Sequence, residues 1–219
     1  MKLIPILAAA ASIFAASPAF SAAVTIDFEG TTSFSSVNNF YNGGTDGAGA
    51  SGVNYGIAFS LPAQGLVNDG LGAAAPDGRY FSNQPSGTTV MFAPDSPAVM
   101  DVASGFLGAV SFYYSAKTNP LGSAQATTIT VYDGLGGTGN VVGTGTFGAN
   151  ANADAAWDTW SLASLTLTGM GKSISFGDNG GYIAYDNITV NAVPLPAALL
   201  LFPFGAAALG FAGRRRRQG

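Results

Sequence analysis

The chain of 219 residues contains no cysteine and no histidine, and only 9% of its residues are charged. Without cysteine it can form no disulfide framework and has no thiol to act as a nucleophile or as a soft-metal ligand. Without histidine it cannot build a Ser-His-Asp or Cys-His catalytic centre or a zinc site of the usual composition. Any catalysis or metal binding therefore has to rely on carboxylates.

Basic side chains are scarce outside the two ends of the chain. Residues 24–192 contain three of the eight lysines and arginines but all twelve acidic residues, so this segment carries nine net negative charges. We expect no nucleic acid and no anionic lipid as a partner of this segment, because phosphate binding needs a basic surface. A divalent cation is a partner that suits this charge.

The N-terminus has the composition of a secretory signal peptide. Lys2 precedes an apolar stretch from Leu3 to Ala16, and small residues surround a cleavage position within Ser21–Ala23. This pattern predicts that residues 1–23 direct export and are removed by signal peptidase.

The C-terminus contains an apolar run followed by four arginines. The run from Ala197 to Gly213 carries no charged side chain. As a helix rising about 1.5 Å per residue, it could cross most of a hydrocarbon core of roughly 30 Å. The arginines would stay on the cytoplasmic side, which places the rest of the chain outside. Pro194 and Pro196 keep the preceding peptide extended, because neither continues a helix upstream.

This tail resembles the VPLPA-CTERM variant of PEP-CTERM sorting signals. The residues that carry the resemblance are Val193, Pro194, Leu195, Pro196 and Ala197, followed after the apolar run by Arg214, Arg215, Arg216 and Arg217. The resemblance implies a Gram-negative envelope protein whose precursor is anchored in the inner membrane through residues 193–219. It also implies an exosortase, a membrane enzyme with a cysteine nucleophile, that cuts the signal and passes the mature form to the cell surface or beyond. A plain C-terminal anchor that is never cut is the alternative.

Residues 24–192 have the length of one domain and show the alternation of apolar and polar residues that is typical of strands. Strands are predicted at 24–29, 110–115, 128–132, 164–168, 172–176 and 184–191, within a total of roughly eight to ten. Turns rich in glycine and asparagine separate them. The predicted fold class is all-β: a single jelly-roll β-sandwich, flanked by the signal peptide and the C-terminal transmembrane sorting helix.

The segment 31–54 is the least strand-like part of this domain, because it is rich in glycine, serine and asparagine. Its position between strands predicts a long surface loop. No lysine or helix follows its Gly-rich run, so it is not a phosphate-binding loop. The segment is either a turn-dense loop or an ion-binding loop that uses Asp46.

Three acidic residues near the ends of the domain form the candidate metal site. Asp27 and Glu29, the single glutamate of the chain, lie in the first predicted strand, and Asp186 lies in the last. Alternation places Asp186 on the core face with Ile188 and Val190, where a carboxylate needs compensation. Hard oxygen ligands suit Ca²⁺, so a structural calcium ion is one interpretation. Hydrogen bonds to a neighbouring strand, without a metal, are the other.

These strand ends are similar to those of carbohydrate-binding-module jelly rolls, in which a carboxylate from each end helps to hold a calcium ion. The resemblance implies Glu29 and Asp186 as ligands. Asp27 is a weaker candidate, because it shares a face with Glu29 opposite Phe28. This chain has Asn187 at the second acidic position of those modules, which reduces the number of ligands.

Sugar binding requires exposed aromatic side chains with polar groups nearby. Alternation predicts that Trp157 and Trp160 lie on opposite faces of one strand, and that Tyr113 lies opposite Phe112. Each aromatic residue is also a candidate for core packing. The other aromatic candidates are Tyr41, Tyr55, Tyr80 and Tyr182.

The sequence favours a non-enzymatic cell-surface or extracellular-matrix protein that binds or associates with exopolysaccharide. The alternative is a secreted carbohydrate-active hydrolase, since two carboxylates that face one cleft can hydrolyse a glycosidic bond. No aspartate or glutamate stands in a distinctive catalytic motif, so the sequence assigns no catalytic residue.

Overall fold

The computed structural model of the protein describes residues 22–68, 80–119, 121–150, 157–177 and 180–193, and within these ranges it contains ten strands and no helix. Each predicted strand window overlaps one of these strands, so the prediction of an all-β fold is confirmed. The strands are β1 (Ala22–Ile26), β2 (Ile57–Phe59), β3 (Gln64–Val67), β4 (Thr89–Phe92), β5 (Ala98–Ala116), β6 (Thr127–Tyr132), β7 (Val141–Phe147), β8 (Ser161–Thr166), β9 (Gly171–Phe176) and β10 (Ile183–Ala192).

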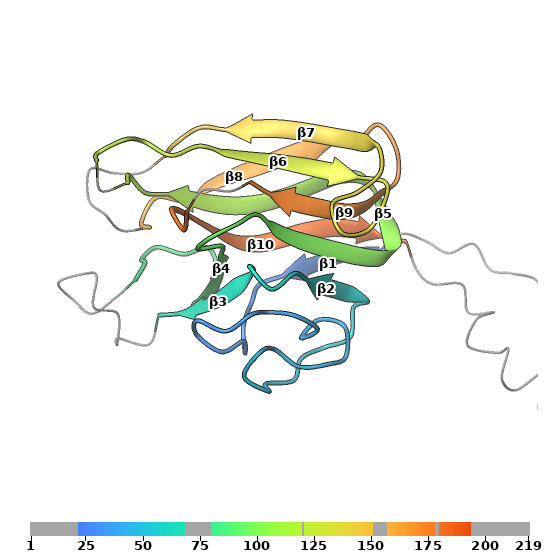
Figure 1. The fold of residues 1–219 in the computed structure, drawn as a ribbon, viewed down its shortest axis with the longest axis horizontal. Coiled ribbons are helices and arrows are strands. Elements are labelled where there is room, and N and C mark those ends of the chain that lie inside the picture. The colour runs from blue at the N-terminus through green and yellow to red at the C-terminus, as the bar shows by residue number, and fades with distance from the viewer. Residues whose placement is uncertain (1–21, 69–79, 120, 151–156, 178–179, 194–219) are drawn as a thin grey trace, which may run out of the picture.

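The strands pair antiparallel in one continuous sheet, which β5 folds into two layers (Figure 1). The first half of β5 pairs with β2 and β9, and the second half pairs with β8 and β10. The register with β9 is interrupted between Asp101 and Phe106. Gly105 lies in this interval with a φ of 78°, a conformation that glycine adopts without steric cost. The bend at Gly105 lets one long strand contribute to both layers.

One layer contains β2, β5, β9, β6 and β7, and the other contains β3, β4, β10, β5 and β8, with β1 beside β10. Consecutive strands β8, β9 and β10 alternate between the layers, which is the connectivity of a jelly-roll sandwich. The predicted fold class is therefore confirmed at the level of architecture.

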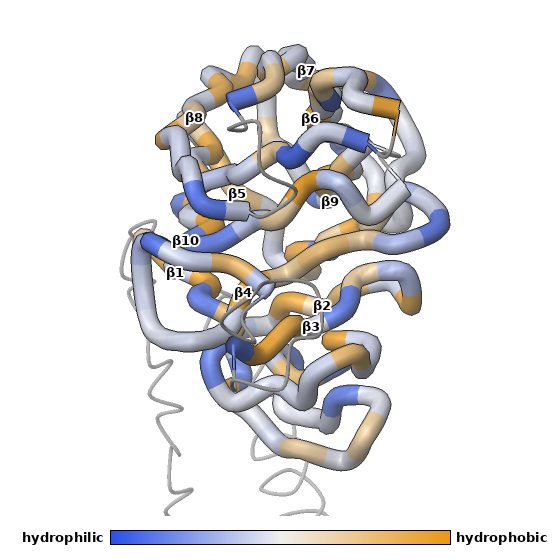
Figure 2. Tube along the Cα trace, turned by 90° about the vertical axis from the view of Figure 1, so that its left-hand side faces the viewer, coloured by the Kyte–Doolittle hydropathy of each residue, from blue (hydrophilic) through white to orange (hydrophobic). Residues whose placement is uncertain are grey.

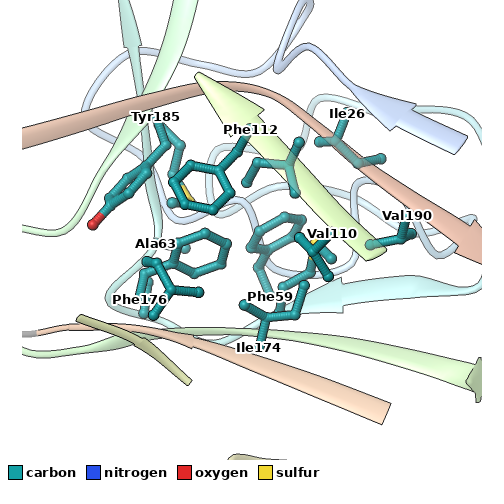
Figure 3. Packing of buried hydrophobic residues seen from close by; sticks show 14 of the residues in the cluster. Ile26, Phe59, Ala63, Val110, Phe112, Ile174, Phe176, Tyr185 and Val190 are labelled. Carbon is teal, nitrogen blue, oxygen red and sulfur yellow. The ribbon is translucent and has the colours of Figure 1, made fainter. Parts of the chain in front are cut away.

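The hydrophobic core fills the space between the two layers (Figure 3). Phe112 of β5 and Tyr185 of β10 face Phe176 of β9, at ring-centroid distances of 6.5 and 4.9 Å. The Tyr185 and Thr127 hydroxyls share a hydrogen bond of 2.6 Å, so the polar end of this buried ring is satisfied. Aromatic contacts across the layers thus hold the sandwich together.

Hydrophobic positions are spread along the strands of both layers rather than gathered in one long run (Figure 2). In β5, Val110 and Phe112 are buried in the core, while Tyr113, the residue after Phe112, is only partly buried and points to the opposite side. The predicted alternation of this strand is confirmed.

Residues 27–56 form the long loop that the composition predicted, and the loop lies against β2 and β3 (Figure 1). The first strand ends at Ile26 rather than at residue 29, because Phe28 has a φ of 62° and turns its ring into the core. Three further loop residues are buried in the same core: Val37, Phe40 and Tyr41. The loop is therefore a packed part of the domain and not a linker.

Strand β10 connects the two ends of the sandwich. Its last residue, Ala192, pairs with Ala22, the first residue of β1, so the described chain begins and ends at the same end of the sandwich (Figure 1). Its first residue, Ile183, lies at the other end. A strand of ten residues spans roughly 30 Å, which separates the two ends by about that distance.

Candidate functional site

Glu29 lies shortly after β1, and its carboxylate holds the segment that leads into β4. Glu29 Oε1 accepts hydrogen bonds of 2.7 Å from the backbone N–H groups of Thr88 and Thr89. Gly87 has a φ of 46° and passes so close that a Cβ atom there would collide with the Glu29 carboxylate. Glu29 therefore anchors the segment 86–89, and the contact depends on glycine at position 87.

Asp186 is fully buried in β10 beneath the same segment. Its Oδ2 accepts a hydrogen bond of 3.1 Å from the Ser86 N–H, and its Oδ1 accepts one of 2.7 Å from the Asn187 N–H. The Ser86 hydroxyl also donates to Asp186. Burial raises the pKa of Asp186 to about 6, and the negative charge of Asp27 adds to the rise. The hydrogen bonds that the metal-free interpretation requires are thus present.

The predicted orientation of Asp186 toward the core is wrong. Asp186 pairs with Tyr113 on the outer side of β5, whereas Val190 pairs with Val110 in the core. A β-bulge lies between these two pairs, and Asn187 within it has a φ of 50°. The extra residue shifts the alternation by one. Asp186 therefore lies on the outer face, where the segment 86–89 covers it.

Asp27 lies next to these two carboxylates. Its Oδ1 accepts a hydrogen bond of 3.2 Å from the Glu29 N–H. The Tyr41 hydroxyl is buried without a hydrogen-bond partner in the described part of the chain. Burial first, and then the charge of Asp27, raise the pKa of Tyr41. A buried polar atom that lacks a partner thus accompanies the carboxylates.

The donor set suits Ca²⁺, because Asp27, Glu29 and Asp186 supply hard oxygen atoms. The unpartnered Tyr41 hydroxyl is a further oxygen atom that an ion could engage. Among the described residues, however, no three acidic groups converge on one metal position. Backbone N–H groups instead point at the Glu29 and Asp186 carboxylates. Calcium binding here stays a prediction.

Asp46 organises the loop between β1 and β2 and is itself buried. Its carboxylate accepts hydrogen bonds of 2.8, 2.9 and 2.8 Å from the backbone N–H groups of Thr32, Ala48 and Ala50. Although burial opposes it, this hydrogen bonding holds the pKa of Asp46 below its ordinary value. Of the two interpretations of Asp46, this geometry favours the turn-dense loop.

A row of aromatic rings lies at the end of the sandwich opposite the two chain ends. We call this row the aromatic ridge, and its members are Phe34, Tyr80, Phe92, Trp157 and Tyr182 together with Lys117. Phe34 packs edge-on against Tyr80 and Phe92, at centroid distances of 5.3 and 6.0 Å, and Phe92 lies 6.1 Å from Trp157. Phe34 is 55% exposed, Tyr80 and Tyr182 are partly buried, and the other two rings are buried beneath them.

Lys117 adds a cation to the aromatic ridge. Its Nζ atom lies 3.9 Å from the centre of the Trp157 ring and 5.9 Å from that of Tyr182. Burial lowers the pKa of Lys117. Among the described residues, no hydrogen bond or ion pair of the ammonium group is found beside these two ring contacts.

The two tryptophans do not lie on opposite faces of one strand, so this expectation is wrong. Residues 157–160 precede β8 and form only an isolated bridge between Trp157 and Phe81. Both indole rings pack against the same outer hydrophobic cluster. Trp157 Nε1 donates to the Tyr182 carbonyl and Trp160 Nε1 to the Ser82 carbonyl, each at 2.9 Å. Trp157 thus belongs to the aromatic ridge, and Trp160 packs against the cluster that supports it.

Sequence reasoning missed Phe34, Phe92 and Lys117 as members of the ridge. Lys117 had a readable signal, because it is one of three basic residues in an otherwise acidic domain. Phe34 had no such signal in the sequence, since its position depends on a φ of 56° that its residue type does not predict.

The sorting residues from Pro194 to Arg217 and most of the predicted signal peptide lie outside the described residues. Val193 is described, and its N–H donates to the Gly105 carbonyl at 2.9 Å. The described part of the chain contains no helix that is long and apolar enough to cross a membrane.

No family model and no curated protein sequence matches the chain. Among solved structures it is similar to the K2 cleaved adhesin domain of Lys-gingipain, with 15% identity, a TM-score of 0.48, and coverage of 77% of this chain and 99% of that one. It is also similar to CsCBM6-3 from Clostridium stercorarium in complex with cellobiose, with 20% identity, a TM-score of 0.33, and coverage of 49% of this chain and 77% of that one. A third similar structure is the carbohydrate-binding module CBM6cm-2 from Cellvibrio mixtus lichenase 5A in complex with cellotriose, with 14% identity, a TM-score of 0.31, and coverage of 52% of this chain and 84% of that one. Likenesses at this level do not establish a shared function.

Proposed function

We propose that this chain is an exported, non-enzymatic protein of the cell surface or extracellular matrix that binds polysaccharide through the aromatic ridge. The observation that carries this proposal is the contiguity of the ridge, which joins the exposed ring of Phe34 to the ammonium group of Lys117 through Phe92 and Trp157. Aromatic faces pack against the C–H faces of sugar rings, and N–H donors bind sugar hydroxyls.

The direction of the chain supports a surface role. Val193, where the predicted sorting signal starts, lies at one end of β10, and Tyr182 of the ridge precedes the other end. A precursor held in the inner membrane by its tail would thus present the ridge away from the membrane, about 30 Å from its attachment. Exosortase processing of the tail would then release the domain to the surface in a binding-competent form.

The hydrolase alternative has one observation in its favour. Asp186 has a pKa raised to about 6, and a carboxyl group whose pKa is raised toward neutrality can act as a general acid. Asp186 is fully buried beneath Ser86, however, so a glycosidic oxygen cannot approach its carboxyl group. This burial favours the non-enzymatic function.

The test is retention of the full chain, purified in detergent, on insoluble neutral and acidic polysaccharides, with released reducing ends assayed in the same samples. Tyr80→Ala and Tyr182→Ala should each weaken retention roughly three- to tenfold, the effect of losing one aromatic contact of about 0.5–1.5 kcal/mol. Tyr55→Ala is the matched control, because Tyr55 is a 41% exposed tyrosine at the opposite end of the sandwich.

Equal losses in all three variants would show that the ridge is not the binding surface. No retention on any polysaccharide would leave a structural surface protein whose partners are other proteins. Release of reducing ends that Asp186→Asn abolishes would establish the hydrolase. Intact mass of the surface form tests the processing, since a form that retains residues 214–217 is a plain anchor.

A further inference from the structure

A pocket of about 330 Å³ lies at the end of the sandwich where the described chain begins and ends. It lies between the start of β1, the turn before β2, the bend of β5 and the end of β10. None of its lining residues carries a charge. They are Ala22, Val24, Asn54, Tyr55, Gly56, Ala103, Ser104, Ala192 and Val193.

The wall of this pocket is fixed by backbone hydrogen bonds. The Ala103 N–H donates to the Gly56 carbonyl at 3.2 Å, and the Val193 N–H donates to the Gly105 carbonyl at 2.9 Å. Tyr55 forms the outer rim, where its ring stacks on that of Tyr41 at an interplanar angle of 13°. The pocket is therefore a formed apolar site and not a gap between mobile side chains.

The chain itself passes this pocket as it leaves the domain, because Val193 is part of the wall. The next residues in the sequence are Pro194, Leu195 and Pro196. A residue before proline is driven toward extended geometry, and in an extended chain side chains two positions apart point to the same side. If the chain beyond Val193 is extended in this way, the side chain of Leu195 would lie on the same side as that of Val193, about 7 Å further along.

We propose that Leu195 docks into this pocket and holds the peptide 194–196 against the end of the domain. The pocket offers an uncharged apolar surface, and Leu195 is the first large apolar side chain beyond its wall. Because the two are joined by a single intervening residue, the effective concentration of Leu195 at the pocket exceeds that of any free ligand. The inference does not rest on polysaccharide binding at the aromatic ridge.

Docking gives the processing of the tail a control point. A protease or an exosortase-type enzyme needs an accessible extended backbone, and a docked Leu195 keeps the backbone on either side of it against the domain. Undocking then precedes cleavage, so processing depends on the folded domain as well as on the signal itself.

The absence of cysteine from the chain allows a direct test with engineered pairs in the full chain in detergent micelles. A disulfide forms only where two Cα atoms come within about 7 Å. Ala103→Cys and Ser104→Cys, each combined with Leu195→Cys, place partners at two positions of the pocket. The control pair combines Leu195→Cys with Leu107→Cys, because Leu107 pairs with Asn191 close to the same chain end, is 45% exposed and lies outside the pocket.

We expect at least one pocket pair to form an intrachain disulfide at least tenfold faster than the control pair under mild oxidation. Equal rates in all three pairs would overturn the proposal. Disulfide-linked dimers would show that the tail of a second copy fills the pocket, which also overturns it. The same test in liposomes checks whether lipid fills the pocket instead. Lipid would be the occupant if the cross-link were lost and the thiol introduced by Ala103→Cys were shielded from aqueous thiol reagents, and this result would also overturn the proposal.

A second variant tests the consequence for processing. Ala103→Trp fills the pocket and should speed proteolysis of the peptide 194–197 at least threefold, with Leu121→Trp as the control. An unchanged cleavage rate in a correctly folded Ala103→Trp variant would show that the pocket does not protect the tail.

Discussion

Lowering the pH from 7.5 to 5 in the presence of EDTA should stabilise the folded protein, because of Asp186. Its pKa of about 6 in the folded state lies above the ordinary 3.8 of an aspartate. Between these two values the folded state binds more protons than the unfolded state, so stability rises as the pH falls. Asp46 and Asp133 have lowered pKa values, so their contributions change only below the ordinary value, outside this window.

The magnitude follows from the position of pH 5 relative to the two pKa values. This pH is one unit below the folded pKa and about one unit above the unfolded one, so the gain from pH 7.5 is about 1.4 kcal/mol. For a domain of this size the melting temperature should rise by roughly 3–5 °C. The assay is thermal unfolding of the full chain in detergent, followed by circular dichroism.

Asp186→Asn is the control, because the amide does not titrate and the variant should show no gain over the same window. An equal gain in the variant, or none in the natural chain, would refute the assignment of the shift to Asp186. Repeating the melts with Ca²⁺ tests the metal. A bound cation would keep Asp186 ionised and reverse the trend, and an unchanged melt in excess EDTA would exclude a structural calcium ion.

Three further outcomes are expected. Gly87→Ala should destabilise the fold by about 1–3 kcal/mol in denaturant titrations, since a Cβ would collide with Glu29 at a positive φ, whereas Gly148→Ala has open space and should be neutral. Asp46→Ala should cost about 1–3 kcal/mol by leaving loop amides without an acceptor, unlike the exposed Asp95→Ala. N-terminal sequencing of the exported form should begin at Ala22 rather than at Val24, because cleavage after Ser21 leaves β1 whole, whereas removal of residues 1–23 would delete its first two residues.

The sequence predicted correctly which side chains face the core wherever the two-residue alternation of a strand continues without interruption. In the second half of β5 the period of two persists, so alternation correctly placed Tyr113 opposite Phe112, which is buried in the core. It failed at β10, because one positive φ at Asn187 shifts the phase and nothing in the residue type requires it. The short strands β2 and β3 were not predicted either, since three or four residues do not establish a period.

The residues of the candidate site were likewise identified only in part from the sequence. Asp186 was identified from the sequence because a carboxylate at a predicted core-facing position needs compensation, and Glu29 was identified from the resemblance of the strand ends to those of carbohydrate-binding modules. Their common partner, the segment 86–89, could not be identified, since it is more than fifty residues from Glu29 and nearly one hundred from Asp186 along the chain. Lys117 was missed as a member of the ridge for the same reason, because β6 and β7 separate it from Trp157 along the chain.

The two ends of β10 give the molecule its functional polarity. At the Ala192 end, the sequence continues into the predicted sorting signal and an uncharged pocket faces the departing chain. At the Ile183 end, Tyr182 and Lys117 belong to the aromatic ridge. β10 pairs with β5 on one side and, on the other, with β4 at residues 184–185 and with β1 at residues 188–192, so it connects the two ends through the sheet. Because the ridge contacts involve no residue near Val193, we expect cleavage of the chain beyond Val193 to leave the ridge intact, which is compatible with the proposed order of anchoring first and binding later.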